Sequence, residues 1–144
     1  MTDPFRRSPR RGAFLVATAC VALAAEACGG APPKSEARLE AGTPLELRSD
    51  GGLATATVEA ENGHLAQGKN ALRVQFDRAD VALDAASAFM PVHGHPAPAP
   101  SVTRASSYYR VTDLIFTMPG LWDVTLDISE GSKTDEMVFS VDVP

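Results

Sequence analysis

The chain has 144 residues, a net charge of −5 and two cysteines. This length allows no more than one ordinary domain. Nine basic and sixteen acidic side chains follow Cys28, so that part of the chain carries a charge of −7. An acidic domain without a basic patch argues against nucleic acid as a partner, because binding to phosphates depends on Lys and Arg.

The N-terminus has the pattern of a secretory signal peptide. Four arginines lie within the first eleven residues, and the apolar run Ala13–Ala25 follows them. The run is shorter than the about 20 residues that a membrane span needs, although an uncleaved anchor helix is an alternative. The run leads into the sequence AEACGG, which looks like a bacterial lipoprotein processing site at Cys28. We therefore predict a signal peptide over residues 1–28, lipidation of Cys28 and a periplasmic domain held to a membrane by that lipid.

Both cysteines lie within or at the edge of this signal, so no disulfide is expected in the exported domain. Residues 29–43 are rich in Gly, Pro and charged side chains and show no apolar period. Such a composition is typical of a flexible tether. From Pro44 onward the pattern changes, and we predict one β-domain over residues 44–144.

Short alternating patterns separated by turn residues fill this domain. Strands are expected over residues 45–48, 53–60, 70–76, 82–90, 108–117, 122–128 and 137–143. The segment Ala82–Met90 is rich in Ala, which favours helix by propensity, but its short length and its neighbours favour a strand. About seven short strands predict an all-β fold, an immunoglobulin-like antiparallel β-sandwich.

Two loops contain the residues that are candidate metal ligands. The segment from Met90 to His95 (MPVHGH) begins a loop with four prolines at residues 91–100 and holds two of the three histidines. His93 and His95 are two residues apart, so on extended backbone both side chains share one face. A second turn contains Met118. Copper(I) is soft and binds thioether sulfur and imidazole nitrogen, so we predict a copper site made of His93, His95, Met90 and Met118.

Each candidate residue has a structural alternative. Met90 at a strand end and Met118 in a turn are also typical core fillers. Trp122 begins an inward alternation and is expected in the core, while His64 is expected to be solvated. Zinc or copper(II) held by the two histidines and a carboxylate is a weaker alternative, since no spacing typical of a closed zinc site is present. No nucleophile–base–acid set and no phosphate loop is visible, so we do not expect an enzyme.

The order of short motifs resembles the YtkA-like domain family and its FixH-like relatives. The motifs are G-K-N-x-L-x-V from Gly68, F-M-P-V-H-G-H from Phe89 and Y-x-V-x-x-L-x-F-x-M-P-G-x-W from Tyr109. The resemblance covers residues 53–143. It implies a small, non-enzymatic immunoglobulin-like sandwich at the outer face of a membrane, linked to copper handling or to assembly of respiratory oxidases. Val92 stands where many members have a further Met, so one soft ligand is absent.

Two functions follow as hypotheses. The first is an exported lipoprotein that binds copper and passes it to a copper-receiving protein. The second is a metal-free interaction or scaffolding module, in which the proline-rich loop 91–100 contacts a protein partner.

Overall fold

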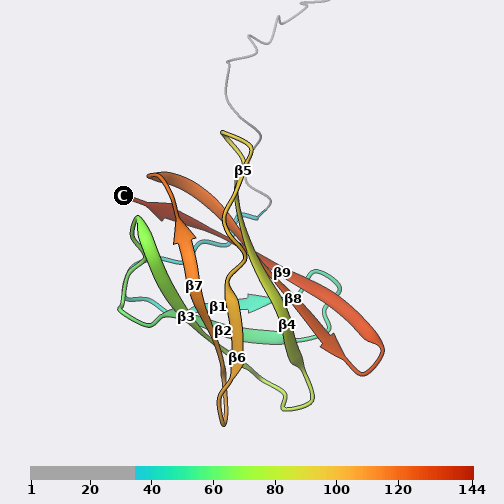
Figure 1. The fold of residues 1–144 in the computed structure, drawn as a ribbon. Helices are drawn as coiled ribbons and strands as arrows, with labels where there is room; N and C mark the ends of the chain where they lie inside the picture. The colour runs from blue at the N-terminus through green and yellow to red at the C-terminus, as the bar shows by residue number, and fades with distance from the viewer. Residues whose placement is uncertain (1–34) are drawn as a thin grey trace, which may run out of the picture.

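The computed structural model describes residues 35–144, which form the two layers of an antiparallel β-sandwich (Figure 1). The expected signal segment 1–28, the lipidation of Cys28 and the first part of the expected tether lie outside the described residues. Among the residues described, no helix is long and apolar enough to span a membrane. The sandwich predicted from the sequence is confirmed, with nine strands within residues 35–144 in place of about seven.

The strands form two antiparallel sheets with the orders β1-β2-β3-β7-β6 and β5-β4-β8-β9. Their bounds are β1 Leu45–Arg48, β2 Thr55–Ala60, β3 Gly68–Phe76, β4 Ala82–Met90, β5 His95–Pro96, β6 Ser101–Arg104, β7 Tyr109–Phe116, β8 Gly120–Glu130 and β9 Lys133–Val143. The two strands that the sequence did not predict, β5 and β6, are short; β5 lies within the proline-rich stretch 91–100 and β6 directly follows it. The segment expected to be a strand in spite of its alanines is strand β4.

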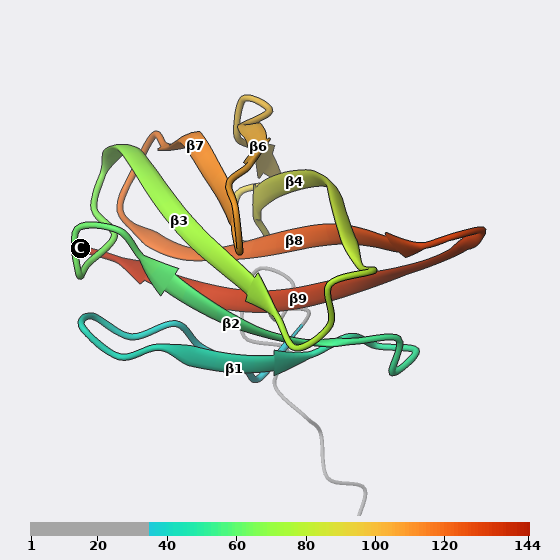
Figure 2. The ribbon, with the colours of Figure 1, turned by 90° about the horizontal axis from the view of Figure 1, so that it is seen from below.

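The edges of the two sheets approach each other. Strand β6 contacts β4, and β1 contacts β9, although each pair belongs to different sheets. Figure 2 shows β8 and β9 lying between the edge strands β1 and β6 of the larger sheet. The larger sheet therefore curves around the smaller one, as the natural twist of strands favours.

The core lies between the sheets and follows the predicted alternation. In β8, every second residue from Trp122 to Ile128 is buried, and in β9 the same holds from Met137 to Val143. The indole of Trp122 packs at 5.4 Å from the ring of Phe116 in the opposite sheet. Its Nε1 donates a hydrogen bond to the Met118 carbonyl at 3.1 Å, so the polar atom of this buried side chain is satisfied.

The start of the ordered domain differs from the prediction. Residue Arg38 forms a parallel bridge with Ser140 of β9, and the Leu39 N–H donates to the Ser140 carbonyl at 3.0 Å. Leu39 is buried in the core. The tether expected over residues 29–43 is therefore shorter at its C-terminal end. Burial of Leu39, its one large apolar side chain, offsets the conformational entropy lost when this segment becomes ordered.

The same segment changes the environment of Asp123. The sequence places Asp123 on the outer face of β8, where solvent is expected. It is only 3% exposed, and the Ser140 Oγ donates to its Oδ1 at 3.0 Å. The Ser35 carbonyl lies 3.1 Å from the same Ser140 Oγ. The N-terminal segment thus pairs along the edge strand β9, and its Ser35 carbonyl lies beside the Ser140 hydroxyl that contacts this carboxylate.

A second carboxylate organises the loop between β1 and β2. Asp135 accepts hydrogen bonds from the backbone N–H of Gly51, at 2.9 and 3.0 Å, and of Leu53, at 3.2 Å. Burial raises the pKa of Asp135, but hydrogen bonds from Ser49 and from backbone N–H groups outweigh this effect and lower the pKa to about 2. The ionised side chain therefore ties this loop to β9.

Gly120 provides a test of the packing beneath the turn between β7 and β8. Its φ is +124°, and a Cβ at this position would lie 2.8 Å from the Met90 Cε. We expect Gly120→Ala to lower the free energy of unfolding by about 2–3 kcal/mol, from backbone strain and the contact together. Chemical denaturation measures the change.

Gly131→Ala is the matched control for this substitution. Gly131 also has a positive φ, +61°, but has no atom near the position of a Cβ. Its substitution should cost about 1 kcal/mol. Equal costs at the two glycines would contradict the packing of Met90 under this turn.

Asp135 predicts a pH dependence of stability. Because its pKa is about 2 in the folded protein against an ordinary 3.8, its contribution is complete above pH 4 and is lost as pH falls toward 2. We expect Asp135→Asn to lower the free energy of unfolding by about 1–2 kcal/mol at neutral pH. The difference between variant and parent should shrink between pH 4 and 2, as followed by denaturation at each pH. A difference independent of pH would argue against this role, and Asp127→Asn controls for loss of an exposed β8 carboxylate.

Candidate functional site

The candidate site is the hairpin formed by β4 and β5, which extends beyond the sheets in Figure 1. Met90 and His95 are directly paired, and the four residues between them form the turn. The Gly94 N–H donates to the Met90 carbonyl at 2.9 Å, and Gly94 has a φ of +66°. Pro91 restricts φ at the start of the turn and Gly94 supplies the left-handed conformation at its end. These two residues explain why the chain reverses here.

The hairpin brings His93 and His95 together on the surface. Both side chains are exposed, their ring centroids lie 6.3 Å apart, and the ring planes differ by 31°. A metal about 2 Å from an imidazole nitrogen lies about 3.2 Å from the ring centroid, so two rings that share one ion lie up to about 6.4 Å apart. The observed spacing therefore fits one ion held between the two imidazoles.

Met90 does not join the histidines at the surface. It is 2% exposed and belongs to the core, where its Cε packs beneath Gly120. Directly paired residues of an antiparallel ladder point to the same face, yet His95 remains exposed because β5 is a two-residue edge strand. The structure thus gives Met90 the core-filling role that the sequence left open as an alternative.

Met118 lies at the same end of the sandwich as the hairpin. Its neighbour Gly120 packs on Met90, so the β7–β8 turn and the base of the hairpin are in contact. Met118 is half-buried and packs against the core. Of the methionines within residues 35–144, it alone is not fully buried.

Other potential metal ligands do not gather at this site. Within the part of the chain that the structure describes, no three side chains of His, Cys, Asp or Glu come together in a way that would hold a metal ion. His64 lies in the loop between β2 and β3, where its Nδ1 is 3.2 Å from the Asn62 carbonyl. Zinc or copper(II) bound by the two histidines and a nearby carboxylate therefore gains no support from the geometry.

The sequence did not predict that two large apolar side chains of the hairpin would be exposed. Phe89 is 40% exposed and Val92 is 52% exposed, and they are the only exposed large hydrophobic residues among residues 35–144. Phe89 lies on the outer face of β4, since its neighbours Ala88 and Met90 are buried. The alternation of buried and exposed residues from Ala86 to Met90 turns Phe89 outward.

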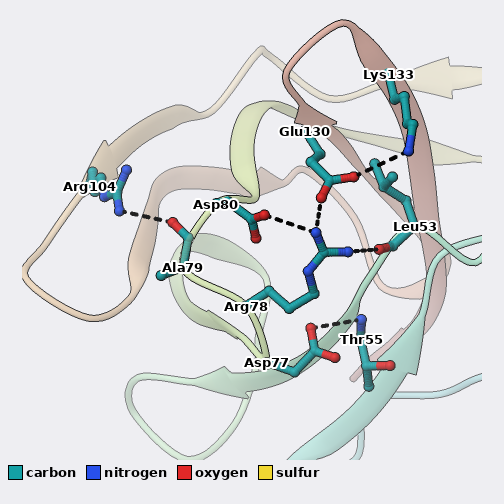
Figure 3. Close-up of polar contacts among 9 residues, drawn as sticks. All are labelled: Leu53, Thr55, Asp77, Arg78, Ala79, Asp80, Arg104, Glu130 and Lys133. Atoms are coloured by element: carbon teal, nitrogen blue, oxygen red, sulfur yellow. Dashed lines mark hydrogen bonds and ion pairs between the residues drawn. The ribbon is translucent and has the colours of Figure 1, made fainter.

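The opposite end of the sandwich has a contrasting, charged character. Figure 3 shows the Arg78 guanidinium between Asp80 and Glu130, with the Leu53 carbonyl as a third acceptor at 3.2 Å. The Lys133 ammonium is 3.7 Å from Glu130. These contacts connect the β1–β2 loop, the β3–β4 loop and the end of β8. They form a structural clamp between the two sheets.

Comparison of the chain with family models, with curated proteins and with solved structures finds no match. The geometry of the hairpin and the motifs of the chain are therefore the observations from which a function can be inferred.

The Arg78 clamp predicts a modest effect on stability. We expect Arg78→Met to lower the free energy of unfolding by about 1 kcal/mol, because its partners are partly solvated. Lys133→Met is the control, since its single long ion pair should contribute less than about 0.5 kcal/mol. Thermal or chemical denaturation compares the two, and a larger loss for Lys133→Met would refute the central position of Arg78.

Proposed function

We propose that this protein is an exported, membrane-anchored lipoprotein that binds copper at the His93–His95 pair and passes it to a receiving protein. The observation that carries the proposal is the pair of exposed imidazoles 6.3 Å apart on a hairpin fixed by the sandwich. The role is that of a carrier, not of an enzyme.

The chemistry of the pair suits copper transfer. Imidazole is a good ligand for copper, and thioether sulfur favours copper(I). Two imidazoles alone leave part of the coordination sphere of the ion open, so a partner can add its own ligands before the two histidines dissociate from the ion. Met118, with part of its surface in solvent, is the thioether best placed to contribute at this end. Met90 has a packing role and is left out of the proposed ligand set.

The motif order supports the same proposal. The resemblance to the YtkA-like family implies a link to copper handling or to assembly of respiratory oxidases at the outer face of a membrane, and the hairpin contains the F-M-P-V-H-G-H motif that carries this resemblance. The apolar run and Cys28 support a lipid anchor.

Titration with copper(I) tests the site. In the soluble domain, His93→Ala/His95→Ala should reduce copper(I) affinity at least about 100-fold, because losing even an outer partner of a ligand commonly costs 10–100-fold. A competing chelator of known affinity gives the measurement. Unchanged affinity in the double variant would show that copper, if bound, is held elsewhere.

Two controls belong with this titration. His64→Ala removes the third histidine, which lies in a different loop, and should leave copper(I) affinity unchanged. Met90→Leu replaces a buried side chain with one of similar volume and should also leave the affinity unchanged. A loss of affinity in Met90→Leu would return Met90 to the ligand set.

A second candidate function is a metal-free interaction module that uses loop 91–100. The exposure of Val92 at the hairpin tip and of Phe89 at its base favours this reading, since exposed apolar side chains often mark contact surfaces. Metal analysis of protein purified from its native compartment separates the two. A metal-free protein that captures a specific partner, and loses it on Val92→Asp, would favour the interaction module.

A further inference from the structure

The hairpin belongs to the longest stretch of the chain without charged side chains. No Asp, Glu, Lys or Arg occurs between Asp84 and Arg104, a run of nineteen residues in an otherwise acidic domain. The adjacent turn, residues 117–121, is also uncharged. The nearest carboxylate on β9, Asp142, pairs with Leu121 and borders this surface on the side away from β4. The hairpin itself is thus uncharged and carries the exposed side chains of Phe89 and Val92.

The N-terminal segment meets the smaller sheet at β9, two strands away from β4 of the hairpin. Asp123 of β8 is paired with Phe89 on one side and with Ser140 on the other, so the three form one row across the outer face. The Ser140 Oγ lies 3.1 Å from the Ser35 carbonyl. Since neighbouring strands are about 4.8 Å apart, Ser35 lies only on the order of 10 Å across the sheet from Phe89.

The proposed anchor is close to Ser35 along the chain. Cys28 precedes it by seven residues, which span at most about 25 Å when extended. The charged clamp around Arg78 lies at the far end of β8, whose eleven residues span about 35 Å. The hairpin, whose Phe89 lies two strand spacings from Ser140, is therefore within the reach of this tether.

We propose that the β4–β5 hairpin docks on the lipid surface of the membrane that carries the anchor, with Phe89 and Val92 in the headgroup region. Aromatic and aliphatic side chains favour this interface, and uncharged surroundings avoid the cost of desolvating ions. Two weak contacts of this kind are sufficient once an anchor keeps the local concentration high.

This inference deepens the proposed function and rests on it for its consequence. Docking would hold the His93–His95 pair at the interface between lipid and water. The copper-receiving protein would then be one whose metal-binding side chains are accessible at the surface of the same membrane. A freely diffusing acceptor would have to approach a site that the membrane partly covers.

Site-specific labelling of the full chain tests the docking. The chain is extracted from the membrane fraction and placed in vesicles of phosphatidylethanolamine and phosphatidylglycerol that contain a nitroxide-labelled lipid. A thiol-reactive fluorophore is attached at Ala99→Cys, just after the hairpin, or at Ser132→Cys, in the turn at the far end of β8. The unsubstituted chain should take up no label, because lipidated Cys28 has no free thiol.

We expect quenching at Ala99→Cys to exceed that at Ser132→Cys by at least about twofold, and Phe89→Ser/Val92→Ser to abolish the difference. Equal quenching at both positions would overturn the proposal, as would a difference that survives the double substitution. Absence of the chain from the membrane fraction would overturn it as well. Copper(I) titration of the same vesicles is independent, so loss of docking with copper binding intact would refute only the docking.

Discussion

The packing of β8 between β4 and β9 is the constraint on which the rest of the structure depends. This strand is hydrogen-bonded on both edges and directs Trp122 and every second residue after it into the core. A slip of one residue would turn this apolar set to the outer face, so the register is strongly specified. The same register places Asp123 beside Phe89 and thereby decides which side chains of the hairpin face outward.

That register separates Met90 from His93 and His95, although the three residues lie close together in the sequence. Met90 completes the inward face of β4 and fills the space below Gly120, where a side chain would collide with it. His93 and His95 come after the last position that the larger sheet can cover, so they remain exposed. Packing therefore takes one soft ligand out of the candidate site and leaves two imidazoles on a projecting support. Copper exchange with a partner requires this kind of accessibility, and a fully enclosed site would not provide it.

The two ends of the sandwich differ in the way they satisfy polar groups. The end around Arg78 uses ion pairs and carbonyl contacts to hold three loops together, and Asp135 fixes one of these loops from β9. At the hairpin end, Met90 packs beneath Gly120, and the Gly94 N–H, the Trp122 indole and the Gln67 amide donate to backbone carbonyls. The hairpin itself carries no charged side chain, so it can approach lipid at a lower desolvation cost than the end around Arg78.

The sequence by itself determined the class of fold, because a period of two in Leu72–Phe76, Trp122–Ile128 and Met137–Val143 is a local property of strands. It also placed a loop directly after Met90, since Pro91 cannot continue the strand for long, but it did not predict that β5 would turn this loop into a hairpin. Only the tertiary structure decided that Leu39 is part of the core, that Asp123 is covered, and that Met90 is turned away from the histidines. Each of these depends on contacts between residues far apart in the chain, and no local pattern carries that information.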